Sequence, residues 1–354
     1  MKSYLIKGYI DMPDNIGIIF NTPKPGNRDS MDVLTQVNAI ERSLSALGHH
    51  PVRIPFTKDL PLFVQTFRQN PLDMVFNLCE TVDEDAGFCG HPAAVLELLG
   101  VPFTGSPSTA LMVSTDKVLT KRLIKSCHLL TPQFLLVTNS RQFNPNFLKF
   151  PLIVKPQFED ASIGIDQDSV ITEKQEINQR LDAFIERFGS VIIEEFIQGR
   201  EFNVSLMGFP TLSPLPVAEI DFTGLPKNYH QIVGYKAKWD ESSTEYKHTT
   251  RKFPENLSPR IRRKIENTAV ICARLLMIRD YGRVDIRMDK NENIYVLEVN
   301  ANPCLSPDAG IAAAALKSGL NYDQMIGKIV DYVKKRSSPD NSHIPQQPIQ
   351  DIAV

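Results

Sequence analysis

The chain has 354 residues, of which 39 are basic and 41 acidic, and its formal net charge is −2. This near balance argues against a general nucleic-acid or membrane-surface binder, and no apolar run approaches the roughly 18–20 residues that span a bilayer. The length allows two or three units of ordinary domain size. Five scattered cysteines without a CxxC motif argue against a disulfide framework or a zinc site. They fit the reducing cytosol, where we expect the protein to act.

The first third of the chain predicts alternating strands and helices. Apolar residues at helical spacing predict one helix over 31–47 that ends at Gly48, and another over 91–99 that ends at Gly100. Strands that alternate with helices favour a parallel α/β unit over residues 1–112. The apolar runs typical of its short buried strands are 15–21, 50–56 and 73–78.

The rest of the chain predicts an α+β arrangement. A helix is expected to carry Asp116 in its first turn, a strand carries Lys155 near its end, and two strands flank a glycine turn within 190–208. A long amphipathic helix precedes a strand hairpin over 281–300. The predicted units are residues 1–112, 113–204 and 205–336, followed by a polar, proline-rich tail, 337–354, that we expect to be disordered.

The predicted hairpin concentrates polar side chains on one face. Side chains alternate along a strand, so Arg283, Asp285 and Arg287 share a face, as do Glu298 and Asn300. Antiparallel pairing would bring these residues into one patch. Two carboxylates and an amide suit Mg²⁺, which completes its coordination with waters and substrate phosphates. A solvated sheet face with ordinary ion pairs is the alternative interpretation.

A second group of residues indicates phosphate binding. Lys155 ends an apolar strand, and Ser162 and Gly164 follow in a loop whose backbone N–H groups can surround a phosphate. Lys117 is another candidate cation. Either lysine alone is more often an ordinary surface charge. The GxxxxGK[ST] and GxGxxG patterns are absent, so neither a P-loop nor a dinucleotide-binding fold is indicated.

Six segments carry a family resemblance. In chain order they read VSTDKVLTKRLI, PLIVKPQFEDASIGI, VIIEEFIQGREFNVS, YKAKWD, YGRVDIRMD and VLEVNANPCLSP. Together they resemble the ATP-grasp superfamily, most closely its D-alanine–D-alanine ligase-like group, over roughly residues 71–333. The resemblance implies a three-domain ATP-grasp fold of the α/β and α+β classes. A parallel α/β domain would come first, and ATP would lie between the middle and C-terminal domains.

The resemblance also implies roles for matching residues. The predicted contacts to the ATP phosphates are Lys117, Lys155, Ser162 and Lys238. The residues predicted to read adenine and ribose are Glu194, Glu195, Ile197 and Glu201. The predicted ligands of two Mg²⁺ ions, with Mn²⁺ as the alternative ion, are Asp285, Glu298 and Asn300. The predicted catalytic cations are Arg283, which would face the acyl phosphate, and Lys155 and Lys238, which would neutralise the moving phosphoryl group.

The substrate side departs from the family pattern. The EGSSVG loop of the family reads EDASIG here, and Trp239 replaces a tyrosine. Cys304 and Ala309 replace a glycine and a serine. The EREVS and HG…GEDG segments are absent, and nearby acidic residues are candidates to substitute for them. The candidate substrate residues are thus Asp29, Asp32, Glu80, Trp239, Cys304 and Ala309.

These residues predict an ATP-dependent, ADP-forming carbon–nitrogen ligase. An acid would be phosphorylated to an acyl phosphate, and an amine would then attack its carbonyl. We expect small, amino-acid-like substrates. A genuine D-alanine–D-alanine ligase, an ATP-grasp kinase that stops after phosphorylation, and an inactive ATP-binding partner are the alternatives, the last disfavoured by the retained metal residues and lysines. A homodimer through the N-terminal unit is a family-level expectation.

Overall fold

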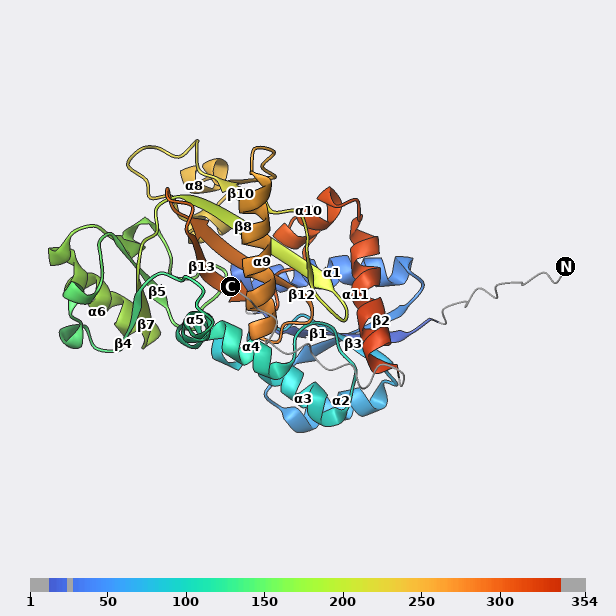
Figure 1. Ribbon diagram of the computed structural model, residues 1–354. Coiled ribbons are helices and arrows are strands. Elements are labelled where there is room, and N and C mark those ends of the chain that lie inside the picture. The colour runs from blue at the N-terminus through green and yellow to red at the C-terminus, as the bar shows by residue number, and fades with distance from the viewer. Residues whose placement is uncertain (1–12, 24–27, 339–354) are drawn as a thin grey trace.

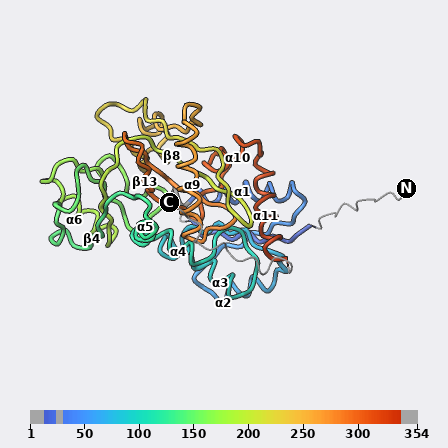
Figure 2. The backbone as a smooth tube through the Cα atoms, in the orientation of Figure 1, coloured from blue at the N-terminus to red at the C-terminus, as the bar shows by residue number. Residues whose placement is uncertain are grey.

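The computed structural model describes residues 13–23 and 28–338, and for residues 28–30 it describes the backbone alone. Three separate sheets divide the chain in space (Figure 1). The backbone tube in Figure 2 shows the middle sheet, in green, standing apart from the blue N-terminal and orange C-terminal parts. Over the described ranges, no helix is both long and apolar enough to cross a membrane. The predicted tail begins at the end of the last helix, and its residues 339–354 lie outside the described part.

The N-terminal sheet is parallel, as predicted. The strand order is β2-β1-β3, and β1 pairs in parallel with both neighbours. Gly48 and Gly100 have positive φ angles of 89° and 65°, which confirms that glycines end the two predicted helices. One further helix, α2, was not predicted. The elements are β1 (Asn15–Asn21), α1 (Arg28–Ala46), β2 (His50–Phe56), α2 (Leu60–Gln69), β3 (Met74–Asn77) and α3 (His91–Leu99).

The middle sheet is antiparallel, in the order β4-β7-β5-β6. Two helices lead into it, α4 (Ser108–Thr115) and α5 (Lys117–Ser126). Asp116 lies between them and caps α5, since its carboxylate accepts from the backbone N–H groups of Val118 and Leu119. The prediction that Asp116 lies in the first turn was wrong by one position. The other elements are β4 (Phe134–Val137), β5 (Leu152–Pro156), β6 (Val170–Ile171), α6 (Ile177–Phe188) and β7 (Val191–Glu195).

The C-terminal sheet has the order β11-β10-β8-β12-β13, with β9 paired to β8. Its long helix α9 begins after Ser258, whose hydroxyl accepts from the N–H of Ile261. The strands are β8 (Arg200–Gly208), β9 (Ser213–Pro214), β10 (Ala218–Asp221), β11 (Thr250–Lys252), β12 (Asp280–Met288) and β13 (Ile294–Asn300). The helices are α7 (Tyr235–Trp239), α8 (Thr244–His248), α9 (Pro259–Leu275), α10 (Gly310–Lys317) and α11 (Tyr322–Ser337).

The two strands predicted around a glycine turn belong to different sheets. β7 pairs with β4 and β5, whereas β8 pairs with β10 and β12. Gly199 lets the chain pass from one sheet to the other, because a Cβ there would lie 2.0 Å from the carbonyl oxygen of Met288. Continuous elements also run across both predicted unit boundaries, α4 across 112/113 and β8 across 204/205.

The predicted hairpin of β12 and β13 is present and antiparallel. Asp285 lies opposite Glu298, and Arg283 opposite Asn300. Beyond Asp285 the register shifts, so that Ile286 pairs with Val296. Leu297 is therefore the extra residue of a β-bulge.

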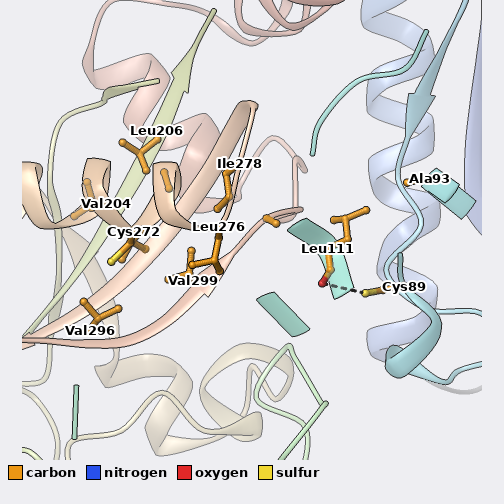
Figure 3. Packing of buried hydrophobic residues seen from close by; sticks show 14 of the residues in the cluster. Cys89, Ala93, Leu111, Val204, Leu206, Cys272, Leu276, Ile278, Val296 and Val299 are labelled. Carbon is orange, nitrogen blue, oxygen red and sulfur yellow. Dashed lines mark hydrogen bonds between the residues drawn. The ribbon is translucent and has the colours of Figure 1, made fainter. Parts of the chain in front are cut away.

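Two hydrophobic clusters join the units. α11 lies beside α1 (Figure 1), where Ile326 and Ile329 pack into the same cluster as Val37 and Ile40. The last helix thus covers the N-terminal unit. The other cluster lies between α9 and the C-terminal sheet and reaches the N-terminal unit at Cys89 (Figure 3). Its members near the sheet include Val204, Leu206, Cys272, Leu276, Ile278, Val296 and Val299.

Candidate active site

The polar face of the β12–β13 hairpin brings the predicted metal residues together. Arg283 donates to both carboxylate oxygens of Asp285, from Nε at 2.8 Å and from Nη2 at 2.9 Å. The amide of Asn300 lies 3.3 Å from Asp285 and 3.4 Å from Glu298. Sequence reasoning missed Asn203 on β8, whose amide donates to Asp285 at 2.7 Å. The register places Asn203 directly opposite Asp285, and its spacing of two from Glu201 was the available signal.

The charges on this face suit a divalent cation. Burial alone would raise the pKa of Glu298, but the surrounding cations, chiefly Lys117 and Lys238, hold it well below its ordinary value. Burial, with the charge of Glu298, raises the pKa of Asp285 to about 6. Two close carboxylates and a rotatable amide are hard oxygen ligands, so they fit Mg²⁺. Over the described residues, no group of three or more His, Cys, Asp or Glu side chains is placed to hold a metal ion.

The two predicted phosphate lysines come from different elements. Lys117 begins α5, where Nζ donates to the carbonyl of Glu159 and lies 3.5 Å from the Asp160 carboxylate. Burial opposes its charge, but Asp160 and Glu298 raise the pKa of Lys117 above its ordinary value. Lys155 ends β5, and its ammonium lies 3.5 Å from Glu194. Both lysines therefore stay close to acidic partners that a phosphate could replace.

A third lysine, Lys121, was missed by sequence reasoning. Its side chain is 1% exposed, as is that of Glu194, and the two are 3.2 Å apart. Lys121 also donates to the carbonyl oxygen of Leu297, the bulge residue, at 2.9 Å. Its position four residues after Lys117 on one helix face was the signal that could have indicated it. Glu194 thus lies between two lysines, with its carboxylate buried.

The segment predicted to read adenine and ribose passes from β7 to β8. The Glu195 carboxylate accepts from the backbone N–H of Lys149 at 2.9 Å. Ile197 and Glu201 both contact Arg287, through the Ile197 carbonyl at 2.7 Å and the Glu201 carboxylate at 2.8 Å. Arg287 therefore joins Ile197 and Glu201. The Glu195 side chain instead binds the backbone shortly before β5 of the middle sheet.

The predicted phosphate loop packs against the segment that carries Lys238 and Trp239, which ends in the helix α7. The Ser162 hydroxyl donates to the carbonyl of Val233 at 2.7 Å, and the Trp239 indole donates to the carbonyl of Ala161 at 3.2 Å. Ala161 and Ser162 both have positive φ angles, 53° and 62°. Lys238 lies in the same segment, and burial together with the charge of Arg283 lowers its pKa. The phosphate loop and the segment 233–239 are thus joined by two hydrogen bonds.

Three predicted substrate residues meet at the junction of the N-terminal and C-terminal units. The Cys304 thiol donates to Asp32 at 3.4 Å. Gln36, one turn after Asp32 on α1, donates to Glu80 at 2.8 Å and accepts from the N–H of Leu305 at 3.0 Å. Sequence reasoning missed Gln36, although its spacing of four from Asp32 places both on one helix face.

Burial controls the protonation of this cluster. It raises the pKa of Glu80 to about 7, against the hydrogen bond from Gln36. It also raises the pKa of Asp32, and with the charges of Glu80 and Asp32 it raises that of the Cys304 thiol far above its ordinary value. Cys304 is therefore a thiol that donates a hydrogen bond, and the environment does not favour a nucleophilic thiolate.

Two substrate candidates remain, Ala309 and Asp29. Ala309 is the N-cap of α10, and its N–H donates to the carbonyl of Ser306 at 2.9 Å. Asp29 lies in the first turn of α1, but its side chain is outside the described part of the chain.

This fold and site define an ATP-grasp enzyme. The structure superposes on the Bacillus anthracis D-alanine–D-alanine ligase solved with ATP, with a TM-score of 0.73 at 21% identity, over 91% of this chain and 97% of that one. The VanG D-Ala:D-Ser ligase from Enterococcus faecalis gives a TM-score of 0.68 at 19% identity, over 91% and 99%. At these identities the similarity establishes the fold.

The family model "D-ala D-ala ligase C-terminus" matches residues 123–331, more than half of the chain, so the protein belongs to this family. It is 28% identical to the D-alanine–D-alanine ligase of Aquifex aeolicus, over 82% of this chain and 92% of that protein. It is 29% identical to the uncharacterized protein y4sG of Sinorhizobium fredii, over 84% and 87%. The predicted class is thereby confirmed: an ATP-dependent, ADP-forming carboxylate–amine ligase of the D-alanine–D-alanine ligase type.

Proposed function

We propose that this ligase joins a small, amino-acid-like acid to an amine, and that at least one substrate is not D-alanine. The observation that carries the proposal is the contrast between the residues for ATP and metal and the residues for the substrates. The hairpin carboxylates, Arg283 and the lysines keep the family pattern, whereas Asp32, Glu80 and Cys304 form a cluster that the family pattern does not contain.

The first step is phosphoryl transfer. A substrate carboxylate oxygen attacks the γ-phosphorus of ATP, and ADP leaves as the bond to the bridging oxygen breaks. Lys117, Lys155 and Lys238 would hold and neutralise the phosphates, and Ser162 would lie in the covering loop. Ile197 and Glu201 would hold base and ribose, with backbone groups of Glu194 and Glu195 beside the base.

Asp285, Glu298 and Asn300 would hold the divalent cation. The buried Asp285 and the partly exposed Glu298 support two Mg²⁺ ions, with Mn²⁺ as the alternative, and the ions would supply charge neutralisation at the phosphates. Binding requires Asp285 to exchange its contact with Arg283 for the metal. The freed guanidinium would then face the acyl phosphate.

The second step is acyl transfer. The amine attacks the acyl carbonyl, Arg283 stabilises the oxyanion, and phosphate leaves as the amide forms and the nitrogen loses its proton. Premature hydrolysis is the competing reaction. The contact between Trp239 and Ala161 supports a role for the two loops in keeping water out.

The substrate cluster supports an amino group on the acid substrate. Asp32 and Glu80 are acceptors at the unit junction, where burial raises the pKa of Glu80 despite the opposing charge of Lys238. An ammonium group would pair with these carboxylates and keep Glu80 charged. Cys304 narrows the site where the family has glycine.

The test is ADP release screened over pairs of amino acids and short peptides, with the product mass determined. A condensed product containing a substrate other than D-alanine supports the proposal. Robust turnover on D-alanine alone would identify a genuine D-alanine–D-alanine ligase. A phosphorylated product without condensation would identify a kinase, which Arg283 makes the weaker candidate because oxyanion stabilisation serves acyl transfer.

We also propose three units with boundaries at 112/113 and 204/205, a homodimer, and action in the cytosol. The five cysteines are free, which supports a reducing cytosol. The three sheets support three units, and ultracentrifugation would test the dimer.

A further inference from the structure

Arg287 is a buried arginine that the proposed mechanism does not use. It lies on β12, two residues after Asp285 and on the same face, and it is 3% exposed. Nε and Nη2 both donate to Oε2 of Glu201, at 3.0 and 2.8 Å. Both bonds end on one oxygen, so the arginine does not use Oε1. A charge-assisted pair of this kind fixes the carboxylate in position and angle.

The same guanidinium reaches two further segments. Nη1 donates to the carbonyl of Ile197 at 2.7 Å, and Nη2 donates to the carbonyl of Gln231. Its Cζ atom lies 4.8 Å from the ring centroid of Phe196 and 5.8 Å from that of Phe222. Arg287 thus ties the link between β7 and β8, β8 itself and the 222–231 segment to the strand that carries Asp285.

We propose that Arg287 is a positioning residue for the nucleoside half of ATP. This inference rests on the proposed function, in which Ile197 and Glu201 hold base and ribose. Arg287 orients Oε1 of Glu201 toward a ribose hydroxyl. It also holds the Ile197 backbone at a fixed position relative to β12, the strand that carries Asp285. Without it, Glu201 would be a buried carboxylate with no charged partner among these contacts, and its side chain would lose the bonds that orient it.

The chain offers a matched control on the same sheet. Arg200 donates to both oxygens of Glu219, at 2.7 and 2.8 Å, and lies 5.0 Å from the ring of Phe202. This pair resembles the Arg287 pair in chemistry, but it has no proposed part in nucleotide binding. Arg200→Met therefore reports the cost of losing a similar pair from the sheet.

The experiment measures binding of ATP, 2′-deoxy-ATP and 3′-deoxy-ATP by calorimetry, and kcat and KM for each in ADP release. For Arg287→Met we expect KM for ATP to rise about tenfold to a hundredfold, with kcat changed less than about threefold. The preference of the wild type for ATP over one deoxy analogue should fall to near unity. Arg200→Met should keep that preference.

Several results would overturn the inference. One is a wild type that binds ATP and both deoxy analogues equally, and another is an Arg287→Met variant that keeps the preference. If that variant does not fold, Arg287→Lys is the test, because it keeps the positive charge but loses the paired N–H donors of the guanidinium. An Arg287→Lys variant that retained the preference for ATP would refute the positioning role. Failure of the proposed function would be distinguishable, because calorimetry still reports the ribose preference when no acid supports ADP release.

Discussion

The substitution Glu80→Gln tests the physical description of the substrate cluster. In the wild type, burial raises the pKa of Glu80 from 4.5 to about 7, while Gln36 donates to it at 2.8 Å. Glutamine keeps a side-chain oxygen that can accept this bond and carries no charge at any pH. The variant therefore removes the cost of ionising a buried carboxylate and keeps the local geometry.

The sign and size of the effect follow from linkage. The folded state binds the Glu80 proton more tightly than the unfolded state, so this residue's contribution to the free energy of unfolding is largest below pH 4.5. It decreases as pH rises and is fully lost above the folded pKa of about 7. Relative to the wild type, Glu80→Gln should gain about 2 kcal/mol between about pH 5.5 and about pH 8.5.

The assay is urea unfolding of the wild type and the variant at these two pH values. Glu186→Gln, an exposed glutamate on α6, is the control and should show no such change. If the difference between Glu80→Gln and wild type stays the same at both pH values, Glu80 is not a buried carboxyl with a raised pKa, and its assignment to the cluster fails.

Three further predictions concern the site. Asp285→Asn should lower ADP release by about a hundredfold or more while far-UV circular dichroism stays unchanged, because it removes a metal ligand. Lys121→Met should lower the free energy of unfolding by about 3 kcal/mol in urea, because Glu194 loses one of its two buried cations. Trp239→Phe should raise ADP release in the absence of an amine at least about twofold, because it removes the indole bond to Ala161.

Each of these predictions has a contrary outcome. Near-normal turnover of Asp285→Asn would contradict the assignment of Asp285 as a ligand of the divalent cation. Unchanged stability of Lys121→Met would mean that Lys155 alone satisfies Glu194. For Trp239→Phe, ADP release without the amine that equals the wild-type value would show that the loop contact does not exclude water.

The sequence predicted the hairpin face because its signal is local. Alternation of side chains and a short turn are enough to place Asp285 opposite Glu298. The lysine at position 121 could not be predicted in the same way. Its burial depends on Glu194, which lies more than seventy residues later, on strand β7 of the middle sheet. An isolated lysine on a helix is ordinarily a surface charge.

The sheet to which β8 belongs could not be predicted, for a related reason. The glycine after β7 indicated a tight turn, but local sequence does not determine which sheet accepts the next strand. Pairing of β8 with β12 depends on the hairpin roughly eighty residues later. The same limit applies to Gln36, which links Glu80 and Leu305 from three distant parts of the chain.

The bulge at Leu297 sets the phase of the last strand. Strict alternation would put Val296 on the same face as Glu298, yet Val296 is fully buried in the core while Glu298 faces the site. One added residue reverses the alternation between them, so a single strand serves the core at its start and the reaction at its end. Deleting Leu297 would leave Val296 and Glu298 adjacent on a regular strand and still on opposite faces, but it would remove the bulge and with it the Leu297 carbonyl that accepts from Lys121.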